Sequence, residues 1–373
     1  MLRALIPALS ALAFATVGHA QAPTSSPALQ PTAPAASKWP VQEHDLIVRD
    51  FKFRSGETLP ELRLHYLTLG TPRRDAQGHV TNAVMGLHGT GGLGRSLINP
   101  VFADVLFKPG GRLDIQKWFV ILPDGIGHGG SSKPSDGLRM RFPHYDYADM
   151  VEAQHRILVD GLKVDRLRLI IGTSMGCMHA FVWGEAYPGF AQALMPLACQ
   201  SVELAGRNRM WRQGIIDIIE ADPDWKGGDY TTPPVHALRA AAIIQSIAGS
   251  APLPQQIAMP TREKAEANLR QVEKRGEAVD ADDLIYALNA SRTYDPSRDL
   301  EKITVPVTWI NSGDDFINPP ELGLAEPASH RMPKARFVLI PASKDTHGHG
   351  THTWASLWEG ELGKLIARSG GEP

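Results

Sequence analysis

The stretch that decides the fold of this chain is IIGTSMGCMHA, residues 170–180. It places G-x-S-x-G between an apolar run, Leu167–Ile171, and a run that can continue as a helix, Met175–Tyr187. A bare G-x-S-x-G is common by chance. A strand before it and a helix after it are the context of a nucleophile elbow, whose sharp turn lifts the serine Oγ clear of the sheet and leaves room only for small flanking residues. The stretch therefore predicts an enzyme with Ser174 as its nucleophile.

Apolar strands and helices alternate on both sides of this stretch, which is typical of an α/β sheet covered by helices on both faces. The run 62–69 alternates with period two and predicts an early, partly exposed strand. The other expected strands are 82–88, 118–122, 166–171, 193–197, 305–310 and 337–340. Helices are expected at 147–162, 175–187 and 354–367.

Residues 201–299 lose the strand pattern and have the pattern of helices interrupted by Pro and Gly. The expected helices are 209–221, 235–247, 261–274 and 281–290. The economical interpretation is one α/β core, 41–200 and 300–373, with an all-helical insertion between its sixth and seventh main strands. Ligands bind at the carboxyl ends of the strands in such sheets, so we expect the insertion to cover that end as a lid.

The N-terminus has the pattern of a secretory signal peptide. A positive charge at Arg3 precedes the apolar stretch Ala4–Val17, and small-x-small cleavage motifs follow. The apolar stretch is short for a membrane anchor, which needs about 20 apolar residues. We expect a signal peptide at 1–20, a disordered linker rich in Pro, Ala, Ser and Thr at 21–40, and export to the periplasm or the medium.

Composition excludes some classes of partner. The 373 residues are 43% hydrophobic and 21% charged, which is ordinary for a globular protein with a large core. A formal net charge of −2 gives no reason to expect binding to nucleic acid or to an anionic membrane surface.

Two cysteines are too few for a disulfide scaffold. Cys177 follows the elbow and Cys199 ends the next expected strand, so the two are candidates for neighbours in space. Export permits a bridge between them, but two buried free thiols are the favoured interpretation.

A serine hydroxyl needs a base to take its proton, and the base needs a carboxylate to hold one tautomer. In sheets with a nucleophile elbow the acid follows the seventh strand and the histidine follows the eighth. Residues 311–319, NSGDDFINP, and residues 343–352, SKDTHGHGTH, stand at those two places. Both loops carry the required residue types in the required order.

Each of these loops leaves alternatives open. Asp315 is favoured as the acid, with Asp314 as the runner-up. Among the histidines His349 is favoured over His347 and His352, because flanking glycines let a loop imidazole reach the serine. A metal site at this His-x-His cluster is disfavoured, since no Cys or further His cluster accompanies it. We expect no metal and no cofactor.

A tetrahedral intermediate needs two hydrogen-bond donors for its oxyanion. The N–H of Met175, directly after the nucleophile, is one expected donor. The N–H of Thr90 is the other, in the glycine-rich turn HGTGG, residues 88–92. This turn lacks the spacing of a phosphate-binding loop. The segment 124–132, DGIGHGGSS, has some likeness to a dinucleotide loop, but no obvious helix follows it and a flexible loop is expected.

Several motifs together resemble the homoserine O-acetyltransferase-like branch of the α/β-hydrolase superfamily, from about Leu62 onward. These motifs are the Ser-Met-Gly elbow, DPDWKGGDY at 222–230, DADDLIY at 280–286 and YDP at 294–296. The resemblance implies a mostly parallel sheet with a helical lid, and Ser174, Asp315 and His349 as nucleophile, acid and base. Relatives pair through their lids, so it also implies a possible homodimer.

The chain departs from the acetyltransferases in ways that favour hydrolysis. Gly350-Thr351 follows His349 where an aspartate is usual, and the turn 88–92 is closer to hydrolase HG-x turns. An exported enzyme would not meet acetyl-CoA, which is a cytoplasmic metabolite. Cleavage of a small ester is therefore the expected reaction, with acyl transfer as the first alternative and an inactive binding protein on the same fold as the second.

Three arginines of the expected lid, Arg207, Arg209 and Arg212, are candidates to hold a substrate carboxylate. Solvated surface arginines are the favoured interpretation.

Overall fold

The structure, a computed structural model, describes residues 38–373. The expected signal peptide, and the expected linker up to residue 37, lie outside the described residues. Along 38–373 no helix combines the length and the apolar character needed to span a bilayer.

One eight-stranded sheet forms the centre of the molecule, in the order β1-β2-β4-β3-β5-β6-β7-β8. Its strands are β1 (Gln42–Lys52), β2 (Thr58–Leu69), β3 (Ala83–Leu87), β4 (Phe119–Pro123), β5 (Leu169–Thr173), β6 (Leu194–Leu197), β7 (Val307–Ser312) and β8 (Ala335–Ile340). β2 is antiparallel to both β1 and β4, and all other neighbours are parallel. The mostly parallel sheet expected from the sequence is confirmed.

The central strands stand out in the sequence as apolar runs because they are buried in the structure. Every residue of β3, β4, β5, β6 and β7 is buried, as in parallel strands covered on both faces. β1 was not expected, because it is an edge strand with seven exposed positions among its eleven residues. It continues the sheet through pairing with β2 alone.

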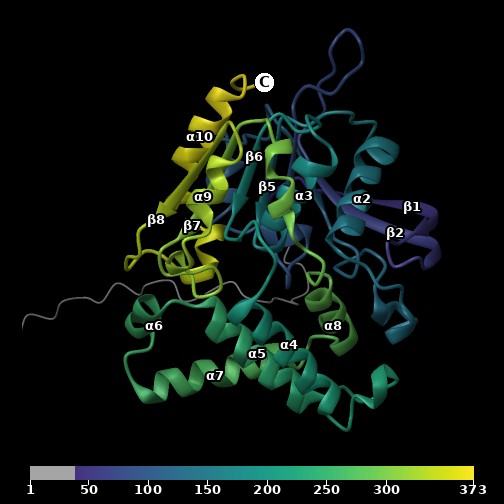
Figure 1. The fold of residues 1–373 in the computed structure, drawn as a ribbon, viewed down its shortest axis with the longest axis vertical. Helices are drawn as coiled ribbons and strands as arrows, with labels where there is room; N and C mark the ends of the chain where they lie inside the picture. Colours follow the sequence, from purple (N-terminus) through teal and green to yellow (C-terminus); the bar gives the residue numbers. More distant parts are fainter. Residues whose placement is uncertain (1–37) are drawn as a thin grey trace, which may run out of the picture.

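Helices cover both faces of the sheet (Figure 1). On one face α2 (Tyr147–Arg156) and α3 (Met175–Ala186) pack through aromatic side chains such as Phe181 and Trp183. On the other face α1 (Ala103–Leu106) and α10 (Glu359–Arg368) contribute to a second buried cluster that includes Trp358. The short α9 (Ala325–His330) precedes β8.

Two expected helices differ from the structure. The helix expected at 147–162 is α-helical only to Arg156 and continues as a π-helix, Ile157–Leu162. The terminal helix begins at Glu359 rather than at 354, because the preceding segment forms short 3-10 turns, 348–353 and 355–357. In that segment the Ala355 N–H donates to the carbonyl of Val101, just before α1, at 3.0 Å.

The strand-free segment forms a group of helices apart from the sheet, seen at the bottom of Figure 1. They are α4 (Gly206–Ala221), α5 (Val235–Gly249), α6 (Pro252–Ala258), α7 (Arg262–Gly276) and α8 (Ala281–Asn289). A separate apolar cluster joins α4, α5 and α8, with Ile215, Leu238 and Leu288 among its buried members. The short α6 was not expected, since prolines interrupt its pattern and one of them begins the helix.

Candidate active site

Ser174 stands on a strained turn between β5 and α3. Its backbone has φ 54° and ψ −108°, a conformation that L residues rarely adopt. A Cβ on Gly172 would lie 2.0 Å from the carbonyl oxygen of Gly176, and a Cβ on Gly176 would lie 2.4 Å from that of Leu87. Both glycines are thus required by close backbone contacts. The strand-turn-helix context expected from the sequence is the one found.

His349 lies between Ser174 and Asp315. Its Nε2 is 2.8 Å from Ser174 Oγ, and its Nδ1 is 2.9 Å from Asp315 Oδ2. The serine follows β5, the aspartate follows β7 and the histidine follows β8, so the carboxyl ends of three strands bring the three side chains together. The geometry is that of a nucleophile, a base and the acid that orients the base.

Asp315 is fully buried, and its carboxylate accepts several hydrogen bonds. Its Oδ1 accepts from the N–H of Ile317 at 2.8 Å and of Asn318 at 3.0 Å, and its Oδ2 accepts from Asn318 Nδ2 at 3.2 Å. Burial alone would raise the pKa of Asp315, but the His349 charge and the hydrogen bonds from His349 and Asn318 hold that pKa below its usual range. The carboxylate is therefore ionised and fixed against the imidazole.

Asp314, the alternative acid, points to a different set of partners. Its carboxylate accepts from Thr346 Oγ1 at 2.7 Å, from the N–H of Gly348 at 3.2 Å and from Ser312 Oγ. It thus ties the loop after β8 to the end of β7. Of the two adjacent aspartates, the one in contact with His349 is Asp315.

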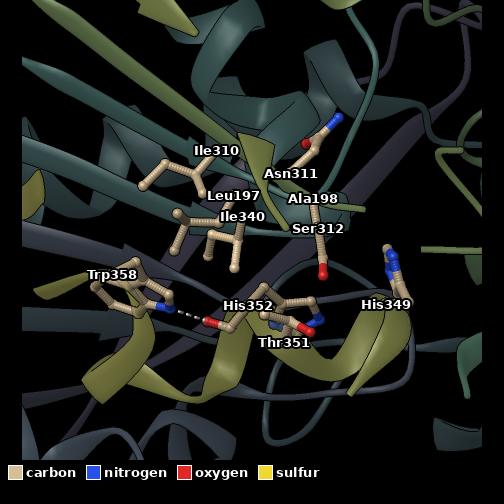
Figure 2. Close-up of a pocket in the computed structure, with 10 residues that line it drawn as sticks. All are labelled: Leu197, Ala198, Ile310, Asn311, Ser312, Ile340, His349, Thr351, His352 and Trp358. Atoms are coloured by element: carbon tan, nitrogen blue, oxygen red, sulfur yellow. Dashed lines mark hydrogen bonds between the residues drawn. The ribbon is translucent and has the colours of Figure 1, made fainter. Parts of the chain in front are cut away.

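The two neighbouring histidines do not contact the serine. His347 stacks on Trp354 with 3.9 Å between ring centroids. His352 is partly buried, and desolvation together with the His349 charge lowers its pKa to about 3. Figure 2 shows His349 and His352 beside one small cavity of about 10 Å³, roughly the space of one water molecule. Within residues 38–373 no group of three or more His, Cys, Asp or Glu side chains is placed to hold a metal ion.

The glycine-rich turn 88–92 packs directly against the elbow. Gly176 N–H donates to the carbonyl of His88 at 3.0 Å, and a Cβ on Gly89 would lie 3.2 Å from that of Ser174. The N–H groups of Thr90 and Met175 have no acceptor among residues 38–373. The turn and the start of α3 therefore leave two unused donors beside the serine.

Comparison with known proteins agrees with this fold. A sequence profile of the alpha/beta hydrolase fold matches residues 82–346. The chain belongs to the α/β-hydrolase fold family. It is 32% identical over 295 residues to a probable acyltransferase of Methanothermobacter thermautotrophicus, with 79% of this chain and 88% of that protein covered.

This α/β-hydrolase is similar to two further proteins, one in sequence and one in fold. It is 29% identical over 328 residues to a homoserine O-acetyltransferase of Chloroherpeton thalassium, covering 79% of this chain and 81% of that one. The crystal structure of an acetylester hydrolase from Corynebacterium glutamicum superposes with a TM-score of 0.76 at 19% identity, covering 87% and 96% of the two chains. The resemblance to the homoserine O-acetyltransferase-like branch is confirmed.

Arg212 corrects an expectation, since it is not a surface arginine in this α/β-hydrolase. It lies on α4 with 2% of its surface exposed, and burial lowers the pKa of its guanidinium. Its Nε donates to Asn208 Oδ1 at 3.0 Å, whereas its buried Nη1 makes no hydrogen bond of good geometry among residues 38–373. Arg207, by contrast, is exposed and donates to the carbonyl of Phe316 at 2.7 Å.

Tyr147 connects Arg212 to the turn 88–92. Burial raises the pKa of Tyr147, and interactions with Arg212, Ser291 and Thr90 oppose that rise. The tyrosine hydroxyl and Thr90 Oγ1 are both buried without a hydrogen bond of good geometry among the described residues. The buried guanidinium of Arg212 is thus separated from the turn 88–92 by one side chain, that of Tyr147. The sequence could not show this, because the side chains that bury Arg212 come from separate parts of the chain.

Cys177 and Cys199 form a disulfide, so the expectation of two free thiols was wrong. The sharp elbow and the short β6 bring their Cα atoms to 5.8 Å, within the range that a bridge requires. The bond ties the first turn of α3, three residues after Ser174, to the segment that follows β6.

Removing this bridge is expected to lower the free energy of unfolding by about 2–4 kcal/mol, since the closed loop spans 22 residues. The measurement is denaturant unfolding of the wild type with and without reductant, with the Cys177→Ala/Cys199→Ala double variant as the control that reductant should not affect. Equal midpoints for all four samples would contradict a stabilising bridge.

The segment 124–132 is a loop, as expected, but it is buried rather than loosely held. Asp124 and His128 are both buried. The Asp124 carboxylate accepts from the N–H of Gly94 at 2.6 Å and of Gly130 at 2.8 Å. This loop therefore packs as part of the core behind the turn 88–92.

Proposed function

We propose that this protein is an exported serine hydrolase that cleaves a small ester through an acyl-enzyme. The observation that carries the proposal is the continuous contact from Ser174 Oγ through His349 to Asp315, at 2.8 and 2.9 Å. His349 takes the proton of Ser174 as Oγ attacks the ester carbonyl, and Asp315 stabilises the imidazolium that forms.

The remaining steps use groups already in place. The N–H groups of Thr90 and Met175 donate hydrogen bonds to the oxyanion of the tetrahedral intermediate. His349 then gives its proton to the leaving alcohol, and Ser174 keeps the acyl group as an ester. Water, activated by the same imidazole, releases the acid and restores the serine.

Hydrolysis is favoured over acyl transfer by the compartment that we propose. The N-terminal pattern predicts export, and the disulfide between Cys177 and Cys199 supports an oxidising environment, where such bonds persist. Acyl-CoA donors are absent from that environment, whereas water is always present.

The test uses the mature protein with a chromogenic acetyl ester, alone and with acetyl-CoA plus a small alcohol. We expect steady release of the chromophore in water and no requirement for the thioester. A rate that depends on the acyl acceptor would favour a transferase. Absence of turnover with both substrates would favour an inactive binding protein and would contradict the proposal.

A specific observation favours acyl transfer as the second candidate. Arg212 is a buried cation with an unused Nη1, close to the turn beside Ser174. A guanidinium in that position suits a carboxylate on the acyl acceptor or on the leaving alcohol. The sequence relatives include a homoserine O-acetyltransferase, whose acceptor carries such a group.

Arg212→Met is expected to lower the activity toward substrates that carry a carboxylate more than the activity toward neutral ones. Loss of a charge-assisted hydrogen bond worth about 1.5–3 kcal/mol should lower kcat/KM about 10- to 100-fold for an ester or acceptor with a carboxylate. The loss for an uncharged isostere should be much smaller. The quantity measured is the ratio of the two kcat/KM values within each variant, which cancels any loss of folded enzyme.

Arg207→Met is the matched control, because Arg207 is exposed on the same helix. Its kcat/KM ratio should equal that of the wild type. An unchanged ratio in Arg212→Met as well would mean that Arg212 has no part in substrate recognition.

A further inference from the structure

Two buried imidazoles contact the backbone of the glycine-rich turn 88–92, one from its first residue and one from the loop 124–132. His88 and His128 are 3% and 7% exposed, and their ring centroids are 5.0 Å apart. His88 Nδ1 donates to the carbonyl of Gly89 at 2.8 Å, while its Nε2 accepts from the N–H of Gly125 at 3.0 Å. These two partners require the neutral form of His88 with its proton on Nδ1.

His128 approaches the same turn from the loop after β4. Its Nε2 lies 2.8 Å from the carbonyl oxygen of Thr90, and its Nδ1 lies 2.9 Å from that of Ile126. Carbonyl oxygens only accept, so a proton on Nε2 is what joins the imidazole to Thr90. The loop itself is held by Asp124, whose Oδ2 is 2.8 Å from His65 Nδ1.

These contacts act on the two peptide groups that meet at Thr90. A peptide group is planar and trans, so the Thr90 N–H shares one rigid plane with the carbonyl of Gly89. The carbonyl of Thr90 belongs to the next plane. His88 holds the first plane and His128 holds the second, which together fix both backbone angles of Thr90. The direction of the Thr90 N–H is thereby set.

The sequence of the turn explains why such support is needed. Three of its five residues, Gly89, Gly91 and Gly92, have no side chain to restrict their backbone. The close approach of Gly89 to Ser174 leaves little room for a side chain there. An oxyanion donor stabilises a transition state only if it is already aimed before the reaction. The side chains of His88 and His128 must therefore supply the rigidity that the glycines lack.

We propose that His128 is a positioning residue for the oxyanion site, which acts by holding the Thr90 carbonyl so that the Thr90 N–H points at the developing oxyanion. It contacts neither the serine nor the reacting carbonyl. The inference rests on the proposed function, because it assigns a partner to the oxyanion donor of that reaction.

The test compares two substitutions that place an amide at different points. In His128→Gln the side-chain amide can occupy the position of Nε2 and still donate to Thr90. In His128→Asn the shorter amide reaches only the position of Nδ1, beside Ile126. The measurements are kcat and KM for the chromogenic ester, and the affinity of a trifluoromethyl ketone, whose serine adduct carries an oxyanion. His330→Asn, at an exposed side chain on α9, controls for the substitution itself.

We expect His128→Asn to lower kcat about 10- to 100-fold with little change in KM, less than the loss from deleting an oxyanion donor outright. Its affinity for the ketone should fall by a similar factor, because the inhibitor resembles the transition state. His128→Gln should recover most of both losses. The ketone affinity is measured per titrated active serine, so partial unfolding does not imitate the result.

Wild-type kcat and ketone affinity in His128→Asn would overturn the inference. So would equal losses in the Asn and Gln variants, which would mark His128 as a packing residue only. Failure of the proposed function looks different, since the wild type itself would then show neither ester hydrolysis nor capture of the ketone.

Discussion

Ser174→Ala is expected to lower kcat for ester hydrolysis by a factor on the order of 10⁵, leaving only the residual rate that binding and the oxyanion donors provide. The substitution removes one hydroxyl whose hydrogen-bond partner is His349. Alanine has the same backbone strain as serine at φ 54°, so the melting temperature should stay within a few degrees of the wild type. The measurements are steady-state kinetics and thermal unfolding of the same preparation.

Ser55→Ala is a suitable control, since Ser55 is exposed between β1 and β2. This variant should keep the wild-type kcat. A Ser174→Ala enzyme with more than a tenth of the wild-type kcat would refute the assignment of the nucleophile.

Asp315→Asn is expected to lower kcat by a factor of about 10⁴, because an amide opposite Nδ1 favours the wrong tautomer of His349 and cannot stabilise its cation. Asp314→Asn should cost far less, since that carboxylate contacts Thr346 and Gly348 rather than the imidazole. The two substitutions are identical in chemistry and adjacent in sequence. Comparing their kcat values therefore isolates the role of the carboxylate that touches His349.

The outcome that would contradict this account is a similar loss of kcat in both variants. Mild losses in both would mean that neither carboxylate orients the base. Large losses in both, together with lower melting temperatures, would mean that the two aspartates act by holding the loops in place.

The sequence predicted those parts of the fold that have a local signal. The central strands are apolar runs because they are buried on both faces, and the elbow is marked by two glycines that backbone contacts require. The order serine, acid, histidine follows from the topology. The residues that meet at the site could therefore be predicted from the sequence, although their distances could not. Edge strand β1 was missed because most of its residues are exposed, which leaves only Val48 and Phe51 as buried apolar positions.

Other features depend on contacts between distant segments. The choice between Asp314 and Asp315 depends on which carboxylate the turn after β7 directs to His349. The disulfide depends on how sharply the elbow returns α3 toward β6.

Two buried polar side chains also escaped sequence reasoning. Arg212 lies within an otherwise ordinary helical pattern, and its burial is set by other elements. His128 stands in a glycine-rich segment that has the composition of a flexible loop. A pattern of residue types contains no information about which distant carbonyl an imidazole will meet.

The central claim is that Ser174 carries the acyl group, and the most direct measurement is covalent labelling. The mature protein is treated with a serine-directed fluorophosphonate, and the adduct is located by peptide mass spectrometry while ester hydrolysis is followed. We predict one adduct per chain, on Ser174, formed in proportion to the loss of activity. Full loss of activity with the adduct on another residue, or full activity after Ser174 is labelled, would contradict it.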